Sequence, residues 1–247
     1  MALTAAQKAE YARNGYIVVE NLVKPSELAE LRRRIDEIQE GRVAAQTVGA
    51  QVLYEPGAGG AAVAAKPVLR KLSQLATNDE FFRGIASKQS ILDCVAELTG
   101  QAQNIMLYSD QAFLKPALHG SEKPLHQDNS YFKATPMDFG VTCWMAIDDA
   151  TVENGCMNYI PGSHKLGLIP HKEIPNTPHL IPDGSVKLEA EVPCPIPAGA
   201  CIFHHLLALH SSKANKSPKS RRAWALHYVN AKAECPSRDY ADMLKVR

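Results

Sequence analysis

The chain has 247 residues, of which 45% are hydrophobic, and this is enough to bury one sizeable core. Its 27 Lys and Arg against 26 Asp and Glu give a net charge of +1, so no bulk field favours nucleic acid or an anionic membrane as a partner. No apolar run approaches the length of a membrane span, and the first fifteen residues lack the apolar centre of a signal peptide.

The six cysteines contain no Cys-x-x-Cys pair. Several of them, such as Cys143 and Cys201, lie in apolar runs, where a free thiol is an ordinary small core residue. This usage predicts a reduced protein without a structural zinc site, and a cytoplasmic location is the expectation that follows. The sequence does not indicate an oligomeric state.

The first hundred residues carry mainly helical signals. Thr4 and Gln7 have the spacing of a capping box, and Gly15 suits the end of the short helix that they open. Residues 16–19 predict a buried strand. Two amphipathic helices are then predicted, one after Pro25 and one ending at Gly100, with apolar stripes formed by Leu28, Leu31, Ile35 and Ile38 and by Ile91, Leu92, Val95 and Leu98.

Two segments show no regular period. Residues 41–67 are rich in Gly, Ala and Val, and a solvated loop and a lid are both compatible with this composition. Residues 169–187 contain four prolines and two histidines, which predicts an irregular excursion long enough to cover something. Our hypothesis is that this second segment folds as a lid over the site described below.

From about residue 104 the sequence is typical of short strands separated by turns. The clearest strands are predicted at residues 105–114, 141–148, 201–209 and 221–230. Asn154-Gly155 predicts a turn that returns residues 156–160 as the hairpin partner of the strand 141–148. Helices followed by many short strands predict a mainly β protein with flanking helices, built as a sandwich or barrel with helices on one side.

His126-Gln127-Asp128 is the stretch with the clearest chemistry. In a strand, this spacing projects the imidazole and the carboxylate from the same face. With a distant second histidine they would form a facial triad, which leaves the opposite face of an octahedral ferrous ion open for other ligands. The tripeptide is common by chance, so the prediction depends on a third ligand.

His210 is the predicted third ligand. It follows the apolar strand 201–209 and precedes a polar loop, so a rigid strand end would hold it beside an accessible space. His204 shares its face by parity, which leaves a second triad open, while His205 points the other way. The remaining histidines are expected to be structural or at the surface; they are His119, His164, His171, His179 and His227.

Arg221 opens the last predicted strand on the face that also carries Ala223 and Ala225. Small alanines leave room for a ligand, and a guanidinium is a natural bidentate partner for a carboxylate. An iron triad beside this arginine predicts a dicarboxylate-like cosubstrate that chelates iron at one end and meets Arg221 at the other. The alternative is an ordinary surface ion pair.

With these residues the chain resembles the phytanoyl-CoA dioxygenase family of Fe(II)- and 2-oxoglutarate-dependent oxygenases. The resemblance covers most of the chain except residues 41–67 and 169–187. Beyond the triad and Arg221-Arg222-Ala223, it rests on the motifs Gly15-Tyr16-Ile17-Val18-Val19, Lys115-Pro116, Trp144-Met145-Ala146-Ile147-Asp148, Glu153-Asn154-Gly155-Cys156-Met157, Pro161-Gly162-Ser163-His164 and His210-Ser211-Ser212.

The resemblance implies a fold and a set of site residues. The fold would be a double-stranded β-helix, a cupin-like jelly roll in one domain over residues 1–247, with a helical part in residues 1–100 and the jelly-roll core in residues 101–232. The implied iron ligands are His126, Asp128 and His210. The implied 2-oxoglutarate contacts are Arg221, Ser212, Trp144 and Gln111, and Tyr131 is the implied substrate contact.

The implied reaction uses O2 to decarboxylate 2-oxoglutarate to succinate and CO2 and couples this to hydroxylation of an unactivated C–H bond of a small molecule. Hydroxylation is the default because Asp128 retains the carboxylate that halogenating relatives lack. Ser211 stands where many relatives have glycine, which leaves the chemistry unchanged. Desaturation or cyclisation on the same iron, a non-catalytic jelly-roll binding module and a zinc or manganese enzyme are the alternatives. No motif identifies the substrate, and the absence of a long basic run argues against a CoA thioester.

Overall fold

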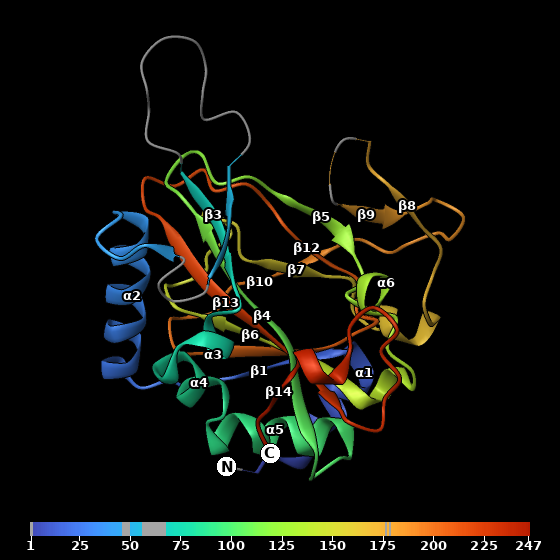
Figure 1. Cartoon of the computed structure of the whole chain (residues 1–247). Coiled ribbons are helices and arrows are strands. Elements are labelled where there is room, and N and C mark those ends of the chain that lie inside the picture. Colours follow the sequence, from blue (N-terminus) through green and yellow to red (C-terminus); the bar gives the residue numbers. More distant parts are fainter. Residues whose placement is uncertain (1, 46–49, 56–67, 176, 178) are drawn as a thin grey trace.

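The computed structural model of the chain, shown in Figure 1, describes residues 2–45, 50–55, 68–175, 177 and 179–247. Within these residues two antiparallel sheets face each other. The larger sheet has the strand order β1-β11-β6-β13-β4-β3-β2, with β14 also paired to β4, and the smaller sheet has the order β10-β7-β12-β5. The hairpin β8–β9 lies beyond β5 (Figure 1). This is the predicted jelly roll.

The strands of the larger sheet are β1 (Tyr16–Val19), β2 (Gln51–Tyr54), β3 (Leu69–Ser73), β4 (Ile105–Lys115), β6 (Gly140–Ala146), β11 (Cys201–His205), β13 (Arg221–Asn230) and β14 (Leu244–Lys245). Those of the smaller sheet are β5 (Lys123–His126), β7 (Met157–Tyr159), β10 (Val192–Cys194) and β12 (His210–Ser212), and the hairpin consists of β8 (His171–Glu173) and β9 (Leu180–Pro182). The helices are α1 (Ala5–Asn14), α2 (Pro25–Gln39), α3 (Leu75–Asn78), α4 (Glu80–Ala86), α5 (Gln89–Thr99) and α6 (Asn129–Phe132). The 3-10 turns are η2 (Met137–Phe139), η3 (Ser163–Leu166) and η4 (Tyr240–Asp242).

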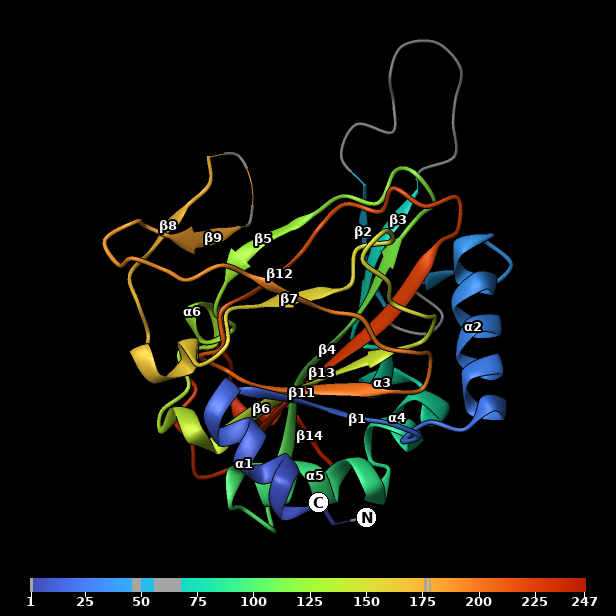
Figure 2. The ribbon, with the colours of Figure 1, turned by 180° about the vertical axis from the view of Figure 1, so that it is seen from behind.

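The N-terminal helices begin and end where the sequence predicts. The Thr4 hydroxyl accepts from the Gln7 backbone N–H at 3.2 Å, and Gly15 ends α1 in the left-handed region with φ 82°. The predicted apolar stripe of α2 is buried. Helices α2 to α5 lie along the outer face of the larger sheet in two opposite views (Figures 1 and 2), which leaves the space between the sheets for the site.

Strand β13 separates two packed layers. Trp224, Leu226 and Tyr228 belong to the main core together with the helices, whereas Ala223 and Ala225 belong to a smaller core between the two sheets. The two faces therefore divide by parity as predicted. Burial of three large side chains on one face stabilises the helical layer, and the small residues on the other face leave volume between the sheets.

The predicted hairpin between residues 141–148 and 156–160 is wrong. Strand β7 pairs with β10 and β12 of the smaller sheet, not with β6 of the larger one. Asn154 makes the turn as expected, since its side chain accepts from Thr151 N at 2.8 Å and donates to Asp149 O at 2.8 Å. The turn carries the chain across to the facing sheet, a choice that local pattern does not encode.

The predicted continuous strand over residues 201–209 is also wrong. Strand β11 ends at His205, where the Leu207 N–H donates to the ring Nδ1 at 3.0 Å and the Ala208 N–H donates to the His205 carbonyl at 2.9 Å. His210 then opens β12 in the other sheet. The parity argument that placed His204 and His210 on one strand face therefore does not apply.

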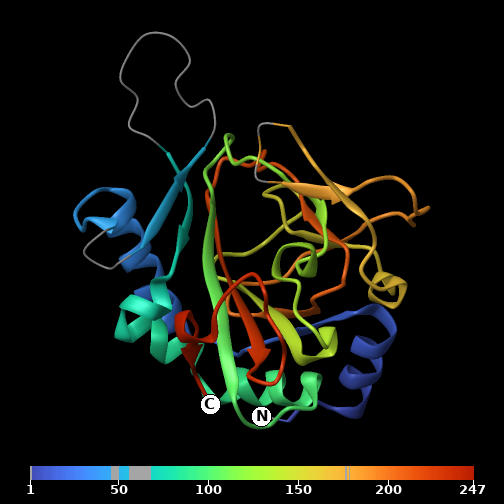
Figure 3. The same cartoon turned by 45° about the vertical axis from the view of Figure 1, so that its right-hand side comes forward.

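The two segments without a regular period contain short strands. Residues 51–54 form β2 at the edge of the larger sheet, while residues 46–49 and 56–67 lie outside the described part of the chain. The second segment forms the β8–β9 hairpin, which Figure 3 shows from another side. Among the described residues, no helix is long and apolar enough to cross a membrane.

Gly155 is a position where we expect a single methyl group to be costly. It adopts φ +83°, and an added Cβ would lie 2.3 Å from the backbone oxygen of Lys213. Gly155→Ala should therefore lower the free energy of unfolding by about 2 kcal/mol or more. Gly84→Ala in α4 is the matched control, since nothing lies within 4 Å of its Cβ position and helix propensity favours alanine. Urea unfolding of both variants checks this, and equal stability would contradict it.

Candidate active site

Two histidines on neighbouring strands of the smaller sheet face each other. His126 ends β5, His210 begins β12, and the two residues are paired in register. The Nδ1–H of His126 donates to the Pro124 carbonyl at 2.8 Å, and that of His210 donates to the Ala208 carbonyl at 2.9 Å. Because these bonds fix the tautomer, each Nε2 keeps its lone pair for a metal ion.

Asp128 joins these histidines by a route that differs from the prediction. Strand β5 ends at His126, and Asp128 has helical dihedrals (φ −58°, ψ −38°) at the start of α6, so the two residues do not share a strand face. The turn nevertheless brings Asp128 Oδ1 to 3.6 Å from Nε2 of both His126 and His210. The three ligand atoms all lie within 4.8 Å of one another, a cluster that fits one metal ion.

The second carboxylate oxygen of Asp128 is anchored to the larger sheet. Its Oδ2 accepts from Thr142 Oγ1 at 2.7 Å and from His204 Nε2 at 3.0 Å. The Tyr159 hydroxyl in turn donates to His204 Nδ1 at 2.9 Å, and His227 Nδ1 donates to Thr142 Oγ1 at 2.9 Å. Such outer contacts orient a ligand and fix which oxygen faces the ion.

Three of these anchoring residues, Thr142, Tyr159 and His227, are not predicted as functional from the sequence, although parity offers a signal for two of them. Thr142 shares its predicted strand face with Trp144, and His227 shares its face with Arg221. His204 is the alternative ligand that parity predicts. In the structure its Nε2–H is occupied by Asp128, so His204 supports the triad and is not grouped with it.

Burial sets the protonation of the cluster. Burial, His210 and Lys123 lower the pKa of His126 to about 3, and burial with His210 lowers the pKa of His204 to about 4. Burial opposes ionisation of Asp128, but the surrounding imidazoles outweigh it and hold its pKa well below the usual range. A neutral His126 beside an ionised Asp128 is the protonation state in which these two residues bind a divalent metal.

We expect His204→Phe to weaken metal binding by about 10- to 100-fold, because Asp128 loses a hydrogen bond that orients it. His205→Phe is the matched control, since His205 bonds to Asp138 on the other side of the strand at 2.9 Å. Competition of each variant with a metal chelator measures the affinity. Equal affinities for both variants would show that His204 does not position Asp128.

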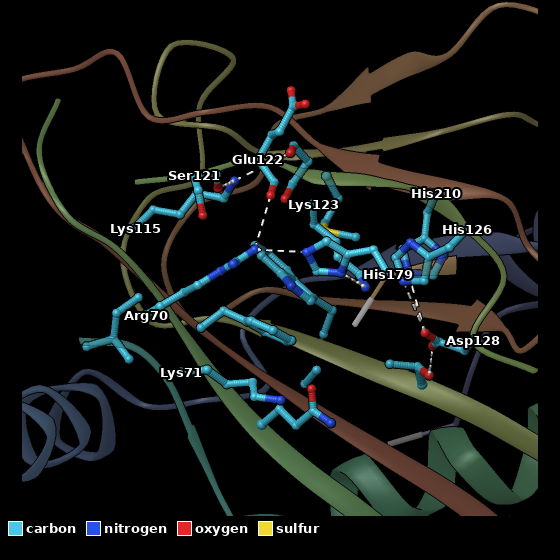
Figure 4. Close-up of a pocket in the computed structure, with 18 of the residues that line it drawn as sticks. Arg70, Lys71, Lys115, Ser121, Glu122, Lys123, His126, Asp128, His179 and His210 are labelled. Atoms are coloured by element: carbon cyan, nitrogen blue, oxygen red, sulfur yellow. Dashed lines mark hydrogen bonds and ion pairs between the residues drawn. The ribbon is translucent and has the colours of Figure 1, made fainter. Parts of the chain in front are cut away.

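A cavity of about 280 Å³ adjoins the triad, and Figure 4 shows part of its lining. The wall includes residues from both sheets and from α6. Every residue that the resemblance implies for cosubstrate or substrate contact lies in this wall: Gln111 on β4, Tyr131 on α6, Trp144 on β6, Ser212 on β12 and Arg221 on β13.

Arg221 is a buried cation with unused hydrogen-bond donors. Its side chain is 1% exposed, and neither Nε nor Nη1 has a hydrogen-bond partner among the described residues. Its Nη2 donates to the Gly155 carbonyl at 3.3 Å, and the guanidinium lies 5.4 Å from the ring centroid of Trp144. Burial lowers its pKa to about 10, so it stays charged at neutral pH. A buried charge without a partner is costly, which indicates a missing anion.

Lys115 holds the segment next to Arg221. Its Nζ donates to the carbonyls of Ser121 at 2.8 Å, Ser212 at 3.4 Å and Lys213 at 2.5 Å. These bonds connect the end of β4 to β12 and to the loop before β5. The role of Lys115 was missed, because it depends on carbonyl groups nearly one hundred residues away in sequence.

Known proteins resemble this chain along most of its length. The family model described as phytanoyl-CoA dioxygenase matches residues 11–223. The peroxisomal phytanoyl-CoA dioxygenase of Homo sapiens is 30% identical over 93% of this chain and 69% of that protein. A probable phytanoyl-CoA dioxygenase of Caenorhabditis elegans is 29% identical over 92% of this chain and 76% of that protein.

The fold is also found among solved structures. The crystal structure of the non-heme alpha-ketoglutarate-dependent carbocyclase SnoK from nogalamycin biosynthesis superposes with a TM-score of 0.73 and 21% identity, over 97% of this chain and 89% of that one. Together, the triad, the two-sheet fold and the match over residues 11–223 show that the chain belongs to the phytanoyl-CoA dioxygenase family of Fe(II)- and 2-oxoglutarate-dependent oxygenases.

Proposed function

We propose that this oxygenase hydroxylates an unactivated C–H bond of a small molecule while 2-oxoglutarate is decarboxylated to succinate and CO2. The observation that carries the proposal is the complete His126-Asp128-His210 cluster, in which Thr142 donates a hydrogen bond to the Asp128 oxygen that faces away from the histidines. An iron bound there with 2-oxoglutarate supplies the activation of O2. The whole chain, residues 1–247, would act as one catalytic domain.

The protein contributes ligands of fixed orientation. His126, Asp128 and His210 would bind one face of the iron and leave the other face to 2-oxoglutarate and O2. Asp128 would supply negative charge to the iron through Oδ1. Because its Oδ2 accepts hydrogen bonds from Thr142 and His204, we do not expect it to act as a general base. The Asp128 carboxylate favours hydroxylation over halogenation, because it would take the coordination position on the iron that a halide needs.

Arg221 would bind the carboxylate of 2-oxoglutarate remote from the iron. Its unpartnered Nε and Nη1 support this role, and Ser212, Trp144 and Gln111 line the same cavity. Two donors of one guanidinium match the two oxygens of a carboxylate. The carboxylate of the cosubstrate would then compensate the cost of burying the Arg221 charge.

We further propose that the β8–β9 hairpin covers the substrate side of the cavity. His179 lines the cavity and the Leu180 N–H donates to the Tyr131 hydroxyl at 2.7 Å. The base of the hairpin is fixed by Gln127, whose side chain donates to the Gly167 carbonyl at 2.9 Å and accepts from the Ile169 N–H at 3.0 Å. Replacing residues 172–186 with a short glycine linker should reduce turnover of the true substrate and leave metal binding intact. Unchanged turnover would refute the lid.

An anaerobic titration with Fe(II) and then 2-oxoglutarate tests the proposed cofactor chemistry. The ternary complex should develop a visible metal-to-ligand charge-transfer band, and His210→Ala should abolish it. Added O2 should then yield succinate, and a candidate substrate that raises succinate release should gain one oxygen atom by mass spectrometry. Metal binding without the band would favour a binding module or another metalloenzyme.

Cyclisation or desaturation is the second candidate, and the fold shared with the carbocyclase favours keeping it. Both reactions begin with removal of hydrogen from the substrate, so the same ligands serve them. The mass of the product distinguishes the two, because hydroxylation adds 16 Da whereas cyclisation or desaturation removes two hydrogens. A product without added oxygen would replace hydroxylation with this candidate.

A further inference from the structure

Two cationic side chains and a histidine lie at the end of the cavity near the hairpin, apart from Arg221. Arg70 comes from β3, Lys123 from β5, and His179 immediately precedes β9 (Figure 4). Arg70 Nη2 lies 3.4 Å from His179 Nε2, and Lys123 Nζ lies 3.1 Å from His179 Nδ1. Lys71, also in the wall, adds another positive charge.

The hydrogen bonds of His179 cannot all be satisfied by these neighbours. Both ring nitrogens face cationic donors, yet a neutral imidazole accepts at one nitrogen only and carries a proton on the other. Burial, Lys123 and Arg70 lower the pKa of His179 to about 4, so the ring is neutral at pH 7. One ring N–H therefore points at a cation, and the group has more donors than acceptors.

Tyr131 shows the same surplus. Its hydroxyl already accepts from Lys123 Nζ at 3.1 Å and from the Leu180 N–H at 2.7 Å, which leaves its own proton to donate. Lys123 also lies 4.9 Å from the centroid of the Tyr131 ring. A ligand here would have to be an acceptor.

Among the described residues, the protein supplies no ion-pair partner for Arg70 or Lys123. The side-chain nitrogens of these two residues bond to only two oxygens of the described residues: the Tyr131 hydroxyl, 3.1 Å from Lys123 Nζ, and the Glu122 carbonyl, 3.3 Å from Arg70 Nη2. Glu55, Glu122 and Asp128 also line the cavity, and the Asp128 carboxylate opposes the lowering of the Lys123 pKa. None of these three carboxylates forms an ion pair with Arg70 or Lys123; the Glu55 Oε1 accepts from the Ser121 N–H at 3.1 Å. Burial lowers the pKa of Lys123 to about 8, a cost that an anion would offset.

We propose that Arg70, Lys123 and His179 form a subsite for an anionic group, a carboxylate or a phosphate, carried by the primary substrate. The inference rests on the proposed function, and it narrows the substrate class. The anion would accept from the guanidinium, the ammonium and one ring N–H, with the Tyr131 hydroxyl as a further donor.

The position of this subsite limits the separation between the anionic group and the carbon that reacts. The Tyr131 ring contacts both the subsite and the triad, since its centroid lies 5.8 Å from that of the His126 ring and 4.9 Å from Lys123 Nζ. A molecule anchored by its anion at Lys123 would therefore present a carbon only a few bonds away to the iron. A substrate whose anionic group lies close to the reacting carbon fits these contacts.

The test uses the anaerobic complex with Fe(II) and saturating 2-oxoglutarate, so that Arg221 is occupied. Inorganic phosphate and acetate are titrated separately at constant ionic strength, and calorimetry gives their dissociation constants. Arg70→Gln and Lys123→Gln are compared with Arg13→Gln, an exposed residue of α1 that loses the same charge outside the cavity.

We expect at least one anion to bind wild type and Arg13→Gln equally and each of the other two variants at least tenfold more weakly. Binding of phosphate alone or acetate alone would identify the group. Equal binding to all four proteins, or no binding of either anion, would overturn the subsite. The charge-transfer band in the same samples distinguishes the failure of the two proposals. If wild type shows the band but no selective anion binding, only the subsite is refuted. If wild type shows no band, the proposed oxygenase function is refuted.

Discussion

Replacing Asp128 with alanine is expected to lower the affinity for Fe(II) by more than about 100-fold and to abolish succinate formation. The substitution removes the one anionic ligand of the cluster and leaves His126 and His210 as a neutral pair. It also removes the acceptor of the hydrogen bonds from Thr142 and His204, which leaves two buried donors unsatisfied. Iron affinity by chelator competition and succinate by mass spectrometry measure the effect.

Asp138→Ala is the control for this substitution. Asp138 is also a carboxylate bonded to a histidine, His205, but its side chain is 87% exposed and it is not part of the triad. We expect its iron affinity and succinate formation to equal those of wild type. If Asp128→Ala retained iron and activity to the same degree, the assignment of the metal site would be wrong.

Replacing Arg221 with methionine is expected to have opposite effects on cosubstrate binding and on stability. Loss of the charged partner should weaken 2-oxoglutarate binding by at least about 30-fold, which corresponds to about 2 kcal/mol. The protein without cosubstrate should become more stable, because an apolar side chain of similar length replaces a buried cation with unused donors. Titration of the charge-transfer band and thermal unfolding without 2-oxoglutarate measure the two effects.

Arg222→Met offers a matched comparison at the next position. Arg222 points to the other face of β13, where it pairs with Asp148 at 2.7 Å and with Asp36 at 2.7 Å. Its loss should lower stability by about 1 kcal/mol and leave 2-oxoglutarate binding unchanged. Similar behaviour of the two variants would rule out a specific role of Arg221 toward the cosubstrate.

The sequence predicted those parts of the molecule that depend on local pattern. The cap at Thr4, the stripe of α2 and the two faces of β13 follow from spacing alone, and the structure has them. The grouping of His126, Asp128 and His210 was also predictable, because few residue types bind iron and the motifs around them are distinctive. The backbone that achieves this grouping was not, since Asp128 lies on a turn.

What escaped prediction depends on contacts between distant segments. The chain crosses from one sheet to the other at Asn154 and again after His205, and neither crossing changes the local alternation of apolar residues. The contact between Arg70 and His179 joins residues 109 positions apart. The position of a cation beside a histidine indicates an anion site only when the fold shows that the cation forms no ion pair with a carboxylate.

The placement of the triad across the two sheets has a mechanical consequence. His126 and His210 belong to the smaller sheet, whereas the oxygen of Asp128 that faces away from them is bonded to Thr142 and His204 of the larger sheet. An ion bound by all three ligands would therefore cross-link the two sheets at the end where the triad lies. Metal binding should slow amide hydrogen exchange in β5 and β12 and raise the melting temperature, because only the folded state brings the three ligands together.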